Sequence, residues 1–99
     1  MYIYFERSGG FTGICLKTAV NTADLPPAEA QEWEQCLAEA EFFTAPARPQ
    51  SEPGIDSFIY KLTVVTMERE HTASWREEDT PDELRPMLHQ LTTMARRRL

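Results

Sequence analysis

The sequence predicts an α+β fold, a two-layer sandwich in which a four-stranded, mainly antiparallel sheet carries two helices in the order ββαββα. Two pairs of segments alternate their side chains around a short connection, which is typical of β-hairpins. A segment with apolar residues at steps of three and four follows each pair, as in an amphipathic helix. The 99 residues, 41% of them hydrophobic, suffice for one core, so we expect a single domain over residues 1–99.

The first hairpin is expected at the start of the chain. Aromatic and aliphatic side chains alternate over Tyr2–Arg7, and Ile14–Val20 alternates again. Ser8–Gly10 lies between these segments, and its glycines can adopt the positive φ of a tight turn without steric cost. We therefore expect two paired strands joined by a glycine-rich turn.

The first helix is expected to begin at Pro26 and Pro27. Proline lacks a backbone N–H, and the N–H groups in the first turn of a helix have no hydrogen-bond partner within the helix. An apolar stripe at helical spacing follows, formed by Ala30, Trp33, Leu37 and Ala40. The segment is otherwise acidic, with six carboxylates and no Lys or Arg over Asp24–Glu41. Phe42 and Phe43 are then expected to close the helix against the core.

A long loop and a second hairpin follow. Residues Thr44 to Ile55 are expected to form the loop, because regular structure is interrupted by Pro46, Pro49, Pro53 and Gly54. Ser57–Thr66 then alternates as a strand, Met67–Glu70 makes a turn, and His71–Arg76 returns as the paired strand. A loop of about a dozen residues is long for a small domain, and such loops tend to be functional or mobile.

The last helix is predicted from a start signal and an apolar stripe. Thr80 with Glu83 has the spacing of a capping box, and Pro81 takes the first helical position. Pro86 is expected to kink or loosen the first turns. The stripe is formed by Leu84, Met87, Leu88, Leu91, Met94 and Ala95. Arg96–Arg98 ends the helix and complements the negative end of its dipole.

Charge and composition exclude several classes of function. The chain carries 10 Lys and Arg against 16 Asp and Glu, a net charge of −6, so nucleic-acid binding is not expected. No apolar run approaches the length of a membrane span, so we expect no membrane partner. The start, Met1–Arg7, lacks the basic region of a secretory signal, which favours a cytoplasmic protein without excluding later release from the cell. Cys15 and Cys36 match no zinc or redox motif, and we expect two reduced, buried thiols.

No catalytic constellation assembles in the sequence. His71 and His89 fall on different elements, and no nucleophile–base pair can be drawn. We interpret His71 as a solvated or core residue of a strand and His89 as boundary packing. The acidic face of the first helix lacks the alternating oxygen ligands of a calcium loop. We therefore expect no enzyme activity, no metal and no cofactor, and the residues alone indicate a small acidic binding or structural module.

Five segments of the chain carry a resemblance to a known family. Phe5–Gly13, Asp24–Ala30, Phe42-Phe43, Asp56–Val64 and Pro81–Leu91 resemble, in this order, segments of the emfourins, small proteins that inhibit protealysin and other thermolysin-like metallopeptidases. The resemblance extends over about residues 1–95 and implies an inhibitor without activity of its own. It also implies a thermolysin-like metallopeptidase as the partner, which we expect to be bound 1:1 by a monomer.

Two segments are candidates for the inhibitory contact. Thermolysin-like enzymes favour a large apolar side chain just after the scissile bond, and Leu25 offers one in a connection that Pro26 and Pro27 stiffen, which limits the entropy lost on binding. Asp24 would approach the metal or an arginine of the cleft. The alternative is structural: Leu25 would be a hydrophobic staple on the first helix, with Asp24 as a cap-like residue.

The long loop is the second candidate. Pro53 limits the loss of entropy there and Ile55 offers an apolar end, while the alternative is a plain surface connection. A different class of function also stays open, in which the chain is a structural or regulatory interaction module that binds another protein through its acidic first helix.

Overall fold

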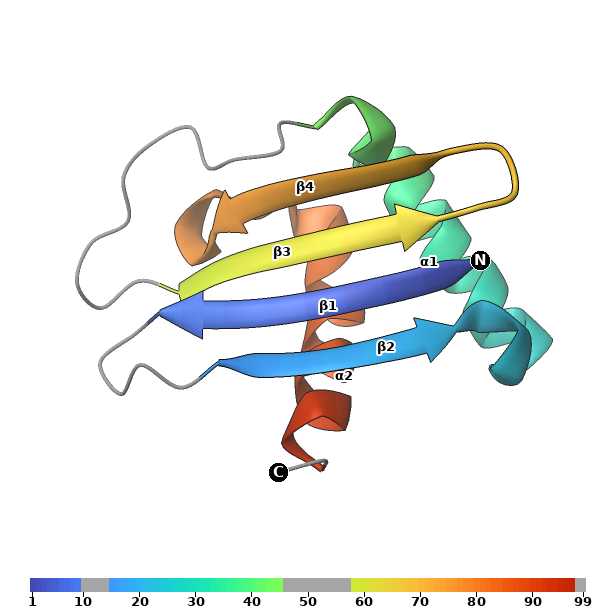
Figure 1. The fold of residues 1–99 in the computed structure, drawn as a ribbon. Coiled ribbons are helices and arrows are strands. Elements are labelled where there is room, and N and C mark those ends of the chain that lie inside the picture. The colour runs from blue at the N-terminus through green and yellow to red at the C-terminus, as the bar shows by residue number, and fades with distance from the viewer. Residues whose placement is uncertain (10–14, 46–57, 98–99) are drawn as a thin grey trace.

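The chain folds into a four-stranded antiparallel sheet with both long helices on one face (Figure 1). The computed structural model describes residues 1–9, 15–45 and 58–97. The strands are β1 (Tyr2–Gly9), β2 (Leu16–Asn21), β3 (Phe58–Val65) and β4 (Glu70–Arg76), and the helices are α1 (Pro27–Glu39) and α2 (Arg85–Arg96). The predicted α+β class and the order ββαββα are confirmed.

The sheet joins the two hairpins through their first strands. The strand order is β2-β1-β3-β4, and β1 pairs antiparallel with both of its neighbours. Tyr2 therefore lies between Asn21 of β2 and Val65 of β3, while at the other end Arg7 lies between Leu16 and Tyr60. The end of β2 and the β3–β4 turn consequently share one end of the sheet, together with the N-terminus (Figure 1).

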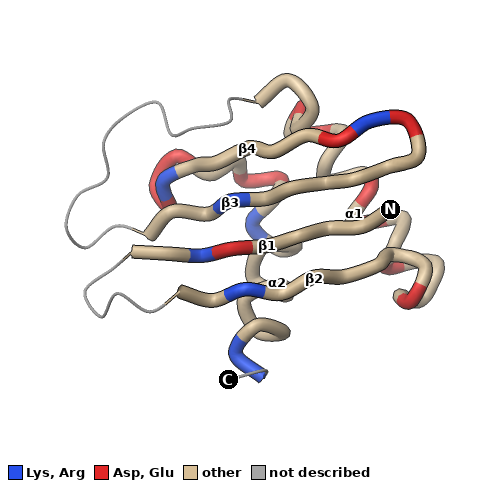
Figure 2. Tube along the Cα trace, viewed as in Figure 1, with Lys and Arg blue, Asp and Glu red and all other residues tan. Residues whose placement is uncertain are grey.

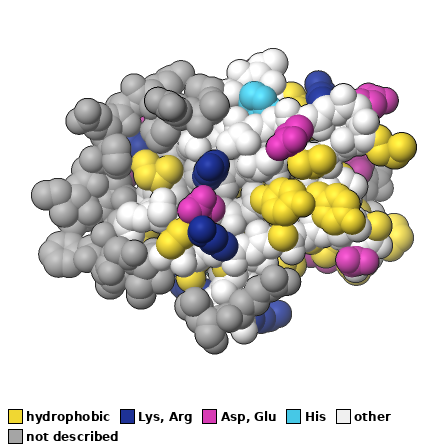
Figure 3. Space-filling model, viewed as in Figure 1, with side chains coloured by type: hydrophobic (Ala, Val, Ile, Leu, Met, Phe, Trp, Pro, Cys, Tyr) yellow, Lys and Arg dark blue, Asp and Glu magenta, His cyan; other side chains and the backbone are white. Residues whose placement is uncertain are grey.

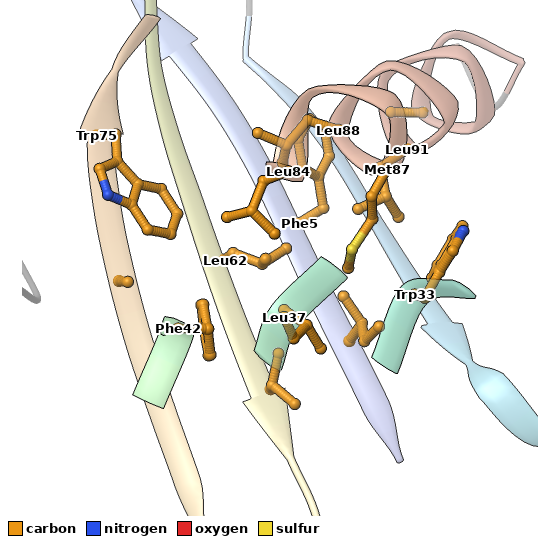
Figure 4. Packing of buried hydrophobic residues seen from close by; sticks show 14 of the residues in the cluster. Phe5, Trp33, Leu37, Phe42, Leu62, Trp75, Leu84, Met87, Leu88 and Leu91 are labelled. Atoms are coloured by element: carbon orange, nitrogen blue, oxygen red, sulfur yellow. The ribbon is translucent and has the colours of Figure 1, made fainter. Parts of the chain in front are cut away.

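The core lies between the sheet and the helices. Alternate residues of the central strands point into it, and Ile3, Leu62 and Val64 are completely buried. Helix α1 contributes Trp33 and Leu37, and the stripe predicted for the last helix packs on them (Figure 4). Each large apolar side chain buried in this way contributes about 1.5–3 kcal/mol, so the two stripes hold the helices on the sheet.

One side-chain hydrogen bond links the two helices. The indole Nε1 of Trp33 donates to Oε1 of Gln90 over 2.8 Å. The ring itself is 2% exposed, and its N–H is the part of a buried tryptophan that requires a partner. This bond gives the contact between the helices a defined geometry in addition to its apolar packing.

The start of the last helix differs from the prediction. Thr80 is not a helix cap; its hydroxyl donates to the carbonyl of Arg76 over 3.0 Å, and the residue ends a short 3-10 turn, η3 (Glu77–Asp79). A second 3-10 turn, η4 (Asp82–Leu84), follows, and α2 begins only at Arg85. Pro86 therefore lies in the first turn of α2, where the N–H that proline lacks would have no partner within the helix, and the residues before it form the 3-10 turn η4 instead of α-helix.

Two of the connections begin at a residue with a positive φ angle. Glu41 adopts a left-handed conformation with φ 53°, which turns the chain from α1 into the 3-10 turn η2 (Phe42–Thr44). Gly9 ends β1 with φ 89°, a value that glycine adopts without steric cost. The rest of the predicted glycine turn and most of the predicted long loop lie outside the described residues.

The two cysteines are free thiols, as expected, but one prediction about them is wrong. Cys36 is half-buried, whereas Cys15 is exposed. Cys15 immediately precedes β2, whose alternation buries Leu16 and exposes Lys17. The position of Cys15 in this alternation turns its side chain away from the helices.

Candidate functional site

The Asp24–Pro27 segment is held at the end of the sheet that carries the N-terminus. A 3-10 turn, η1 (Thr22–Asp24), connects β2 to it, and Asn21 caps this turn by accepting a hydrogen bond from the amide of Ala23 over 3.0 Å. The amide and the hydroxyl of Thr22 both donate to the carbonyl of Met1, over 2.9 and 3.2 Å. The segment is thus tied to the first residue of the chain before α1 begins.

Within this segment, the structure separates the residues by exposure. Asp24, Pro26 and Pro27 are exposed, whereas Leu25 is half-buried and packs against the core cluster. Leu25 stands directly before Pro26, the N-cap residue of α1, which makes no side-chain capping bond. Leu25 therefore stands at the sequence position of a hydrophobic staple, directly before the N-cap residue. One side of its side chain packs on the core, and the other side is accessible to a partner.

The backbone around Leu25 is restrained. Its amide donates to the carbonyl of Thr22 over 3.1 Å, and its φ and ψ of −91° and 155° are extended. Pro26 has φ −54° and ψ 141°, and Pro27 is the first residue of α1. An extended, proline-flanked segment of this kind has little conformational entropy left to lose when a partner binds.

The surface around the segment is acidic. Between Asn21 and Ala45 the chain has no Lys or Arg, and the carboxylates of Glu32, Glu34 and Glu39 lie on exposed positions of α1. Figure 2 shows red segments along α1 and in the turns at both of its ends. This distribution gives the segment an acidic flank, as the charge pattern predicts, and favours encounter with a basic partner surface.

Sequence reasoning missed apolar side chains that are exposed at the same end. Met67, at the tip of the β3–β4 turn, is fully exposed. Beside it, Met1, Leu37 and Phe43 contribute to the lining of a cavity of about 490 Å³, and the guanidinium of Arg69 lies 3.6 Å from the centre of the Phe43 ring. The Met in a turn otherwise made of charged residues was the signal for this feature.

The outer face of the sheet is not covered by any described helix. Tyr2 and Tyr4 are 50% and 48% exposed there, and Figure 3 shows hydrophobic side chains gathered over the part of this face near the N-terminus. Further along β1, Glu6 pairs in register with Lys17 on one side and Lys61 on the other. The two tyrosines extend the apolar surface of this end of the molecule.

The histidines are not brought together. His71 packs edge-on against Phe42, with ring centres 5.4 Å apart, and its Nε2 lies 2.8 Å from the carbonyl oxygen of Ala45, to which it donates. This agrees with a core residue of a strand. His89 is exposed, so its predicted boundary packing is wrong; it lies just beyond the edge of the apolar stripe. Among the described residues, no three His, Cys, Asp or Glu side chains gather to hold a metal.

The second candidate contact is not placed. Pro53 and Ile55 lie outside the described residues, and their role stays a prediction. At the start of that loop, the described part ends with η2, where Phe42 is buried and Phe43 half-buried.

Glu6 lies beside the thiol of Cys15 and favours its protonated form. The thiol donates a hydrogen bond to Oε1 of Glu6 over 3.3 Å. Partial desolvation, followed by this hydrogen bond and the charge of Glu6, raises the pKa of Cys15, while Lys17 acts in the opposite direction. Burial raises the pKa of Cys36 as well, with the charges of Glu39 and Glu32 adding to it.

We expect Glu6→Gln to accelerate alkylation of Cys15 by roughly twofold or more at constant pH, because a lower pKa leaves more of the thiol as thiolate. Alkylation of the intact protein with iodoacetamide, followed by peptide mass spectrometry, measures both thiols in one sample. Cys36 is the internal control and should react at an unchanged rate. An unchanged rate at Cys15 would contradict the role given to Glu6.

Comparison with known proteins gives one match. A family model described as Emfourin matches residues 5–92. No curated protein and no solved structure matches the chain. In the described ranges, no helix is long and apolar enough to cross a bilayer.

Proposed function

Because the chain belongs to the emfourin family of protease inhibitors, we propose that it inhibits a thermolysin-like zinc metallopeptidase by occupying the active-site cleft of the enzyme. The family match over residues 5–92 is the observation that carries this proposal. It begins within β1, covers the other three strands and extends over the larger part of α2, so it concerns most of the fold and not one short motif.

The end of the sheet near the N-terminus supports the proposal physically. Leu25 presents an apolar side chain on a restrained backbone, and Met67 presents another on the β3–β4 turn. Large apolar side chains in a desolvated pocket supply most of the affinity of a protein interface. In the proposed complex, Leu25 enters the pocket after the scissile position, and Asp24 lies beside it, toward the metal or an arginine of the cleft.

A titration tests the function. The purified protein is added to a thermolysin-like peptidase of the protealysin type, and hydrolysis of a short peptide is followed. We expect activity to fall to a low residual level at one equivalent of inhibitor, with a rise in the apparent KM at lower ratios. Full activity in the presence of excess folded protein would overturn the proposal.

The contact residue is tested by a charge substitution. Leu25→Asp should weaken inhibition at least about tenfold, equivalent to ~1.4 kcal/mol, because a carboxylate cannot be desolvated in an apolar pocket without a partner. The measurement is the inhibition constant, with the unfolding temperature of the free variant as a check on folding, since Leu25 also packs on the core.

Met67→Asp and Ile55→Asp are the matched variants. The first places the same charge on a fully exposed side chain of the same end, and the second places it in the predicted loop. If Leu25→Asp is folded and inhibits as wild type, Leu25 is not the anchor, and whichever matched variant loses inhibition identifies the segment that is.

The exposed carboxylates of α1 favour a second candidate function, a regulatory module that binds a basic protein surface through this helix. The two candidates differ in the titration, because a module of this kind leaves peptide hydrolysis unchanged.

A further inference from the structure

A cavity of about 300 Å³ lies at the opposite end of the sheet, between the strands and α2. Arg7 and Tyr60 are register partners on β1 and β3 and line its sheet side. Arg7 shares the alternation of Ile3 and Phe5, so its side chain lies on the helix face of the sheet. Arg7 stands five positions after Tyr2, which places the cavity roughly 17 Å along the strand from the Leu25 end.

The charge of this cavity is opposite to that of the whole chain. Arg7, Arg85 and Arg96 line it, and among the described residues of the lining Glu77 is the only carboxylate, although the net charge of the protein is −6. Asp82, outside the lining, accepts a hydrogen bond from the Nε of Arg85 over 2.9 Å, and the Nη2 of Arg85 donates to the carbonyl of Thr80 over 3.4 Å. Gathering like charges around one space is unfavourable unless an anion neutralises them.

Arg7 has a donor that no described residue accepts from. Its guanidinium carbon lies 3.7 Å from the centre of the Phe58 ring. This stacking fixes the plane of the group and leaves the hydrogen-bonding edge open. The Nε atom is buried and has no hydrogen-bond partner among the described residues. A buried donor in this state is stabilised by an acceptor that enters from outside.

The other polar groups of the lining divide into two kinds. The threonine hydroxyls are already used as donors. They bond to backbone carbonyls over 3.0 Å from Thr80, 2.8 Å from Thr92 and 3.1 Å from Thr93, so their protons are not available to a ligand. His89 and Tyr60 add an imidazole and a phenol to the arginines. The groups that can donate to a ligand therefore come from β1, β3 and α2, on two sides of the space.

We propose that this cavity binds the phosphate group of a small molecule, either inorganic phosphate or a phosphomonoester. Three guanidinium groups, one on β1 and two on α2, face the space from two sides. They match a tetrahedral dianion, whose several oxygens accept from different directions, better than a planar carboxylate. The volume is about ten times the ~30 Å³ that one water occupies in the liquid, so a phosphate with a small organic group fits.

The test is a nuclear magnetic resonance titration of the ¹⁵N-labelled full chain at constant pH and ionic strength. The probes are inorganic phosphate, glycerol phosphate, acetate and chloride. We expect saturable shifts from the two phosphates, confined to the amides around Arg7, Tyr60 and the exposed face of α2. Tighter binding of glycerol phosphate would identify an ester as the ligand, and equal or tighter binding of inorganic phosphate would identify the free ion.

Two variants locate the binding. Arg96→Gln, on an exposed position that the fold does not need, should weaken phosphate binding about tenfold, as expected for the loss of one charge-assisted contact. Lys17→Gln removes a cation from the outer face of the sheet and should leave binding unchanged. Shifts that do not saturate, that acetate reproduces, or that persist unchanged in Arg96→Gln would overturn the proposal. The experiment contains no peptidase, so its result is independent of the inhibitor function.

Discussion

Trp33→Ala is expected to lower the free energy of unfolding by about 3–5 kcal/mol, the range for removing a buried aromatic side chain. Trp33 is 2% exposed and lies where α1 meets α2 and the sheet. The substitution leaves a cavity between the two helices and also removes the donor to Gln90. Small domains have only about 5–15 kcal/mol of stability, so this variant should lie close to unfolding at 37 °C.

Urea denaturation followed by far-ultraviolet circular dichroism measures this loss. Gln90→Ala is the matched control, because it removes the hydrogen-bond acceptor from an exposed position and leaves the ring in place. We expect the control to lose about 1 kcal/mol. Equal losses in the two variants would mean that the hydrogen bond, and not the packing of the indole, holds the helices together.

Phe42→Ala is expected to cost a similar ~3–5 kcal/mol. Phe42 is completely buried, although it stands in a 3-10 turn outside both long helices. Its ring contacts Phe43 edge-on at 5.3 Å between centres, His71 edge-on at 5.4 Å, and Trp75 at 6.2 Å. The turn is thereby attached to β4, and the substitution removes this attachment as well as the buried surface.

Phe43→Ala is the control for this prediction. Phe43 is the adjacent residue of the same type, but it is half-buried and its ring is covered partly by Arg69. We expect it to lose about 1–2 kcal/mol, because less apolar surface returns to water. Thermal unfolding of the two variants under the same buffer compares them directly. A larger loss for Phe43→Ala would contradict the assignment of Phe42 as the anchor of η2.

The elements were predictable wherever a local pattern carried the signal. The alternation around Leu62 identifies the apolar face of a strand, and the stripe around Leu88 identifies the apolar face of a helix. In each case the apolar face is the one that becomes buried. The capping box at Thr80 failed because two local arrangements compete for the same hydroxyl. The turn at η3 offers it the carbonyl of Arg76, and the helix begins later, at Arg85, with Pro86 in its first turn.

The candidate site was predictable only in part. The apolar residue before two prolines marked Leu25, but its half-burial depends on the core it packs against. Met67 stood out as an apolar residue in a charged turn, but its exposure could not be predicted, because it depends on how the hairpin projects from the sheet. The exposure of His89 was unpredictable for the same reason. A residue beside the apolar stripe of a helix is packed or exposed according to how the helix is oriented on the sheet, which the sequence does not report.

The sequence by itself determined the class of fold, the order of its elements, the two apolar stripes and the acidic character of the segment from Asp24 to Glu41. These depend on periodicity and composition, which are properties of neighbouring residues. Only the tertiary structure decided that Arg7 and Arg96, 89 positions apart in the chain, line one basic cavity in an acidic protein. The pairing of β1 with β3 and the packing of α2 bring them together, and no local pattern reports such a contact.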